Sequence, residues 1–260
     1  MPSGRLKRGK TISRRSPSYS DAVAVINHEQ HLRCGRATVM TKKIPVGVLV
    51  SGSGSNLQSL IDHIEAGKLD AEIRVVLCNN ADAYALERCR KHLIPARIVD
   101  HRAFASRELF DRRMIEILNA CGVTLVVMAG FMRILSPEFF RAFPMRIMNI
   151  HPALLPSFPG THVQQKALDY GVRFSGCTVH FADEGVDSGP IIIQAVVPVF
   201  DEDTAESLAE RILKEEHRIY PQAVQYYAEG RIEIAGRRVR IRNGCAAMEK
   251  ALHNPPLTVY

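Results

Sequence analysis

The sequence predicts an α/β fold: a mostly parallel sheet with helices on both faces and an antiparallel extension toward the C-terminus. Short apolar runs alternate with amphipathic stretches through the first half of the chain. These runs lack strict two-residue alternation, which indicates strands that are buried on both faces. A glycine-rich turn follows the first run, and in such sheets ligands bind beyond the carboxyl ends of the strands.

The first half of the chain follows this α/β rhythm closely. Residues 46–50 form a β-branched run typical of a buried strand, and apolar residues then recur at helical spacing up to Gly67. Ser136 and Pro137 begin a later helix, because proline suits the first helical position. The remaining elements follow the same criteria. Strands are expected at 73–77, 96–99, 125–129 and 146–148, and helices at 81–92 and 106–120.

The second half predicts an antiparallel pair of strands and a long helix. Residues 176–182 and 191–197 read as strands joined by a loop that carries three acids and two glycines. Residues 204–230 form a helical stretch that we expect to break at Pro221, since proline removes a helical hydrogen bond. Residues 231–241 predict a final basic hairpin.

Positive charge is concentrated in one segment of the chain. Residues 1–43 hold ten Lys and Arg against two Asp and Glu, whereas the rest holds 24 against 25. The basic segment has few large apolar residues, so we expect a disordered extension, with an upstream start codon or a transit peptide as alternatives. We expect a single domain over 44–242 and a loose tail over 243–260. The neutral body disfavours a nucleic-acid partner.

Cysteine spacing and hydropathy bear on the environment of the protein. The six cysteines show neither a C-x-x-C motif nor zinc-ligand spacing, which predicts a reducing, cytoplasmic compartment and no metal. No apolar run approaches the roughly 20 residues of a membrane span. We expect a monomer or a weak homodimer.

Two motifs at strand ends are candidates for chemistry. The loop 51–56, Ser-Gly-Ser-Gly-Ser-Asn, precedes a helix, and the free N–H groups of a helix N-terminus favour a phosphate. It lacks a dinucleotide or P-loop pattern, so a phosphate monoester is expected; a plain tight turn is the alternative. Asn149 and His151, two residues apart on a strand, should point the same way. An amide can stabilise an oxyanion, and an imidazole can move a proton.

Two further segments should meet this pair. The acidic loop 183–190 could bring Asp187 over His151, where a carboxylate would fix the tautomer of the imidazole; a solvated turn residue is the alternative. The apolar turn 130–135 could line a pocket for a flat heterocycle.

Together these segments resemble the folate-dependent formyltransferases, whose fold is Rossmann-like. Asn-Ile-His-Pro-Ala-Leu-Leu-Pro at 149–156 and the run from Gly176 to Pro190 match the family hallmark. The motifs at 51–57, 129–135 and 215–221 indicate the branch that acts on glycinamide ribonucleotide (GAR). The resemblance covers about residues 45 to 241.

The resemblance implies formyl transfer from 10-formyltetrahydrofolate, a co-substrate rather than a tightly bound cofactor, to the amine of GAR in purine biosynthesis. It implies a catalytic trio, with His180 in support. It also implies two binding sets, and the assigned residues are as follows. The trio is Asn149, His151 and Asp187; the GAR set is Gly54, Ser55, Asn56 and Glu216; the folate set is Arg107, Met132, Arg133, Ile134, Leu135, Asn149, Asp183, Glu184, Gly185, Val186 and Asp187.

Three other activities remain as alternatives. A methionyl-tRNA formyltransferase should carry a basic C-terminal RNA-binding domain, and only about 30 residues follow the last expected helix here. A formyltetrahydrofolate deformylase should carry an N-terminal regulatory domain, for which the polar extension is too short. A nucleotide-binding module that uses only the glycine loop would show no dependence on folate.

Overall fold

The computed structural model describes Met1 and residues 43–244 and 252–254. The expected disordered extension, apart from its first and last residues, and most of the expected C-terminal tail lie outside these residues. The elements have the following bounds. They are β1 (Ile44–Val50), α1 (Ser55–Glu65), β2 (Ala71–Cys78), α2 (Tyr84–Lys91), β3 (Ala96–Ile98), a 3-10 turn (His101–Ala103), α3 (Arg107–Ala120), β4 (Leu125–Met128), α4 (Pro137–Ala142), β5 (Ile147–His151), α5 (Val163–Tyr170), β6 (Phe174–Phe181), β7 (Ile191–Pro198), α6 (Ala205–Ala228), β8 (Ile232–Ala235) and β9 (Arg238–Ile241).

A seven-stranded sheet organises residues 43–244. Its strand order is β3-β2-β1-β4-β5-β6-β7, and the first five strands run parallel. The last two pairings, β5 with β6 and β6 with β7, are antiparallel. This confirms the predicted fold class, and β8 with β9 forms the expected separate hairpin.

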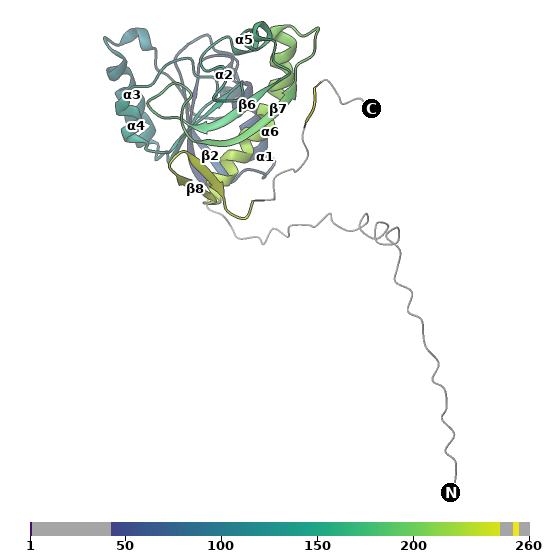
Figure 1. The fold of residues 1–260 in the computed structure, drawn as a ribbon. Helices are drawn as coiled ribbons and strands as arrows, with labels where there is room; N and C mark the ends of the chain where they lie inside the picture. Colours follow the sequence, from purple (N-terminus) through teal and green to yellow (C-terminus); the bar gives the residue numbers. More distant parts are fainter. Residues whose placement is uncertain (2–42, 245–251, 255–260) are drawn as a thin grey trace. The chain divides into compact units, whose positions relative to one another are not determined.

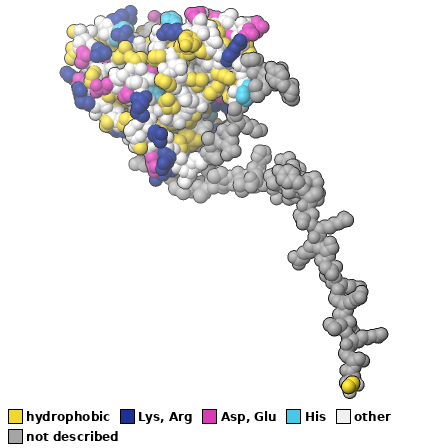
Figure 2. All heavy atoms as spheres, viewed as in Figure 1, with side chains coloured by type: hydrophobic (Ala, Val, Ile, Leu, Met, Phe, Trp, Pro, Cys, Tyr) yellow, Lys and Arg dark blue, Asp and Glu magenta, His cyan; other side chains and the backbone are white. Residues whose placement is uncertain are grey.

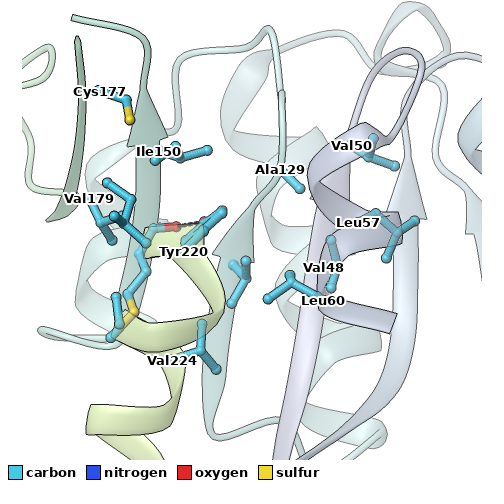
Figure 3. Packing of buried hydrophobic residues seen from close by; sticks show 14 of the residues in the cluster. Val48, Val50, Leu57, Leu60, Ala129, Ile150, Cys177, Val179, Tyr220 and Val224 are labelled. Atoms are coloured by element: carbon cyan, nitrogen blue, oxygen red, sulfur yellow. Dashed lines mark hydrogen bonds between the residues drawn. The ribbon is translucent and has the colours of Figure 1, made fainter. Parts of the chain in front are cut away.

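Helices cover the sheet on both faces, and a distinct core lies beneath each set (Figure 1). On one face α1 contacts α6, and Leu57 and Tyr220 from these helices belong to the same buried cluster as Val48 of β1 (Figure 3). On the other face α3 contacts α4, and Phe110 and Phe139 pack over the sheet. Burial on both faces explains why the strands read as continuous apolar runs.

The expected break of α6 at Pro221 is wrong, because the helix runs without interruption from Ala205 to Ala228. Proline cannot donate to the carbonyl of His217, four residues earlier. Ser59 of α1 supplies the missing donor, with its Oγ 2.8 Å from the His217 carbonyl oxygen. A neighbouring helix therefore satisfies the group that Pro221 leaves free.

Two smaller features were not anticipated. Helix α5 follows the loop 154–160, which contains two prolines, and the residues that flank the helix, His162 and Gly171, adopt the left-handed conformation. In the tail, the Asn254 amide donates to the backbone carbonyls of Arg173 and Val199, at 2.6 and 2.8 Å. Within the described ranges no helix is long and apolar enough to cross a membrane.

The surface seen in Figure 2 carries both signs of charge. Lys and Arg side chains are interspersed with Asp and Glu side chains on this face of the described residues. This mixture agrees with the near balance of charged residues after position 43.

Candidate active site

One face of strand β5 contributes first to the core and then, further along the strand, to the candidate site. Ile147 lies in the core under α3 and α4, whereas Met148 and Ile150 face the opposite core. Asn149 and His151 therefore share the face of Ile147, beyond the part that the helices cover. Both side chains line one cavity, as the strand periodicity predicted.

The antiparallel pairing adds His180 to this face. His180 of β6 stands directly opposite Asn149, and its Nε2 lies 3.2 Å from the Asn149 Nδ2. The His180 Nδ1 donates to the carbonyl of Phe181 at 3.0 Å, so its Nε2 accepts from the amide. Burial lowers the pKa of His180, which keeps the ring neutral and able to accept. His180 thereby fixes the orientation of the Asn149 amide.

The loop after β6 brings Asp187 to both strand residues, as predicted. Its Oδ2 lies 3.4 Å from the His151 Nδ1, and its Oδ1 lies 3.4 Å from the Asn149 Nδ2. The His180 Nε2 is 3.7 Å from the same Oδ1. Asp187 adopts a left-handed backbone with φ of 51°, which aspartate and asparagine tolerate better than most residues. Four side chains thus converge.

Backbone groups that sequence reasoning missed complete the arrangement. The His151 Nε2 lies 2.8 Å from the carbonyl oxygen of Phe158, so this nitrogen carries a hydrogen. The N–H of Gly160 donates to the Asp187 Oδ2 at 2.9 Å. The His151 ring thus lies between a backbone carbonyl at one nitrogen and the Asp187 carboxylate at the other. In the sequence, the two prolines of the loop 154–160 are the only signal that the path of these backbone groups is fixed.

The cavity in front of these side chains has a volume of about 720 Å³. Ile134 and Val186 line the cavity as exposed apolar side chains. Arg107 lines a smaller adjoining hollow, which shares Arg133 and Ile134 with the cavity. The other residues of the expected folate set all line the cavity itself. They are Met132, Arg133, Ile134, Leu135, Asn149, Asp183, Glu184, Gly185, Val186 and Asp187.

The glycine loop forms a second group of residues at the N-terminus of α1. Gly54 has a φ of 68°, and a Cβ there would lie 2.8 Å from the Ala85 Cβ, so only glycine fits. Asn56 and Glu216, expected to bind one ligand, contact each other: the Asn56 Nδ2 donates to the Glu216 Oε2 at 2.7 Å. Both are buried, and desolvation raises the pKa of Glu216 despite this hydrogen bond.

Contacts through the loop after β4 join the two groups. The Ser51 N–H donates to the carbonyl of Gly130 at 3.1 Å, and its Oγ accepts from the N–H of Met132 at 2.9 Å. From α6, one turn after Glu216, the Tyr220 hydroxyl lies 2.9 Å from the carbonyls of Met128 and Met148. In Figure 3 this ring points from the helix toward the strands. The glycine loop and the cavity lined by Asn149, His151 and Asp187 thus share one framework.

Fold and site define an α/β enzyme in which an amide, an imidazole and a carboxylate meet at one wall of a cavity. Among the described residues, no group of three or more His, Cys, Asp or Glu side chains could hold a metal ion. The arrangement supplies hydrogen-bond donors for an oxyanion and a carrier for a proton.

The chain belongs to the formyl transferase family, whose model matches residues 42–224. It is 43% identical over 187 residues to the phosphoribosylglycinamide formyltransferase of Escherichia coli, covering 72% of this chain and 88% of that protein. The expected family is therefore confirmed.

Two further proteins are similar to this chain, and one of them is much longer than the matched segment. The trifunctional purine biosynthetic protein of Drosophila melanogaster is 43% identical over 224 residues, which cover 85% of this chain but 16% of that protein. The crystal structure of glycinamide ribonucleotide transformylase 1 from Symbiobacterium toebii superposes with a TM-score of 0.76 at 52% identity. This superposition covers 77% of this chain and 94% of that chain.

Proposed function

We propose that this protein transfers a formyl group from 10-formyltetrahydrofolate to the primary amine of GAR, giving formyl-GAR in purine biosynthesis. The single observation that carries the proposal is the convergence of Asn149, His151 and Asp187 on one cavity wall. Relatives that carry the name phosphoribosylglycinamide formyltransferase support the choice of acceptor.

The chemistry follows from the charges that the reaction creates. Attack of the amine on the formyl carbon gives an oxyanion and a cationic nitrogen. The Asn149 Nδ2 and the Nδ1 of a protonated His151 can donate hydrogen bonds to the oxyanion in place of their 3.4 Å contacts with Asp187. Asp187 stabilises the imidazolium and can pass a proton from the attacking amine toward the leaving nitrogen of the folate. Transfer is direct, because none of the described residues that line this wall is a serine or cysteine paired with a base.

The two substrates fit the two groups of residues. The pterin of the folate would lie in the cavity against Met132 to Leu135 and the loop 183–187, with Arg107 and Arg133 near its carboxylates. The phosphate of GAR would accept from the N–H groups of Gly54, Ser55 and Asn56. Glu216, held by Asn56, would accept from the glycine amine and keep it close to the formyl carbon.

A single assay separates this activity from its alternatives. The purified full chain is given 10-formyltetrahydrofolate with GAR, with methionyl-tRNA or with no acceptor, and folate release is followed by absorbance. Folate release only with GAR, together with formyl-GAR in the products, supports the proposal. Release without an acceptor indicates a hydrolase, and release only with tRNA indicates the tRNA enzyme; either outcome rejects the proposal.

A further inference from the structure

Arg88 of α2 lies beside the glycine loop, with its guanidinium carbon 4.9 Å from the centroid of the Tyr84 ring. Its Nε donates to the Ser53 carbonyl at 2.9 Å, and its Nη1 donates to the Gln58 Oε1 at 2.9 Å. Its Cδ lies 3.5 Å from the position that a Cβ on Gly54 would occupy. Within the described residues no carboxylate is within ion-pair distance of Arg88, whereas Arg90, on the same helix, pairs with Glu87.

Helix α2 holds two successive carbonyls of the loop. The Gly52 carbonyl accepts from the Ala85 N–H at 3.1 Å, and the next, that of Ser53, accepts from Arg88. In a trans peptide group the N–H points opposite to the carbonyl of the preceding residue. The N–H groups of Ser53 and Gly54 therefore point away from α2, which holds the carbonyls of Gly52 and Ser53. Within the part of the chain that the structure describes, the backbone N–H groups from 52 to 57 have no protein acceptor.

A hydrogen-bonded chain fixes the acceptor of Arg88. The Gln58 Nε2 donates to the Asp62 Oδ1 at 2.8 Å and lies 3.1 Å from the His92 Nε2. The His92 Nδ1 lies 2.7 Å from the Glu65 Oε1, so it carries the hydrogen and its Nε2 accepts. These contacts orient the Gln58 amide, which leaves its oxygen for Arg88.

A guanidinium at the positive end of a helix is unfavourable unless an anion lies beside both. We propose that Arg88 is a positioning residue of the phosphate site: it holds the Ser53 carbonyl away from the site and adds the positive charge that selects a phosphorylated acceptor. This inference rests on the proposed function for the identity of the acceptor. The site needs this charge because a helix N-terminus alone carries only about half an elementary charge.

Three variants of the full-length enzyme test the role. Arg88→Met removes the charge and the donors but keeps the apolar stem, Arg88→Lys restores the charge alone, and Arg90→Met is the matched control on the same helix. The readouts are the KM for GAR, the KM for 10-formyltetrahydrofolate, and the dissociation constant of ribose 5-phosphate measured by calorimetry. We expect Arg88→Met to raise the GAR KM and the dissociation constant of ribose 5-phosphate together, by about tenfold or more. The reason is the loss of the charge-assisted hydrogen bond to the Ser53 carbonyl and of the positive charge beside the loop. The folate KM should stay within about twofold, Arg88→Lys should recover part of the loss, and Arg90→Met should change none of these values.

Several results would overturn the inference. An unchanged ribose 5-phosphate constant in Arg88→Met would remove Arg88 from the site, as would a wild-type enzyme that does not bind ribose 5-phosphate. A parallel rise of the GAR and folate KM values would indicate a merely structural role. If the wild-type enzyme binds ribose 5-phosphate but does not formylate GAR, the proposed function fails, and the calorimetric comparison still decides the role of Arg88.

Discussion

Replacing Asp187 by asparagine isolates the charge at the centre of the proposed mechanism. Asparagine tolerates the left-handed backbone of Asp187, and its side-chain oxygen can still accept from the Gly160 N–H. The variant therefore keeps the loop in place and removes the negative charge beside His151. Alanine would confound this test, because it would strain the backbone and leave the Gly160 N–H without its acceptor.

The spacing of the two side chains sets the expected loss. Unit charges separated by the 3.4 Å between the Asp187 Oδ2 and the His151 Nδ1 attract by about 5 kcal/mol at an effective dielectric constant near 20. Since the amide dipole and water replace part of this, we expect a loss of about 3–5 kcal/mol in transition-state stabilisation, or roughly 10²- to 10⁴-fold in kcat. The KM for GAR should change little, because Asp187 contacts neither the glycine loop nor Glu216.

The assay is steady-state folate release at saturating concentrations of both substrates. Asp201→Asn serves as the matched control, since its carboxylate is 79% exposed and pairs with Arg173 on the surface. Turnover of Asp187→Asn within about threefold of the wild type would refute the reasoning, because an ion pair at this distance must matter if His151 acts as a cation.

Three other substitutions test the framework around the site. Asn56→Ala should raise the KM for GAR by about ten- to a hundredfold, because it leaves the Glu216 carboxyl unpaired; unchanged saturation would show that the glycine loop is only a turn. Tyr220→Phe should lower the free energy of unfolding by about 1–3 kcal/mol in urea titrations, since two buried carbonyls lose their donor; an equal midpoint would contradict this. Arg211 holds the pKa of Asp203 below its ordinary value of 3.8 through hydrogen bonds. Below about pH 4 the unfolded chain binds more protons at this residue than the folded chain, so wild-type stability should fall as pH drops through this range, and the fall should be shallower in Asp203→Asn; parallel pH profiles would argue against the ion pair.

The periodicity of the strands explains why part of the site can be predicted from the sequence. Asn149 and His151 alternate with the apolar residues of β5, and period two alone places both on one face. Asp187 was predictable because a loop that joins two neighbouring antiparallel strands stays close to the strand ends. The parallel order of the first strands followed from their alternation with helices.

The missing parts depend on contacts that no local pattern encodes. The Phe158 carbonyl and the Gly160 N–H are backbone groups, so their residue types carry no trace of what they bind. Pro221 obeys the helix-breaking rule in isolation, yet Ser59, 162 positions earlier, supplies the donor that lets α6 continue. The role of Arg88 could not be predicted either, because a basic residue on an amphipathic helix is usually exposed to solvent. In each case a distant partner decides the role of the residue.

The change of strand direction at β5 creates the cavity. Beside β1 and β4, helical crossovers place α3 and α4 over the same face of the sheet, so that face is filled by core side chains such as Phe139. Strand β6 returns antiparallel to β5, and the helix between them, α5, packs against α6 on the opposite face. His180 therefore lies directly opposite Asn149 on a face that no crossover helix covers. The connection to β7 is then a loop, which folds back far enough for Asp187 to reach His151. A parallel sixth strand would need a crossover on one face of the sheet. On this face, a crossover helix would fill the space where the ligand must enter.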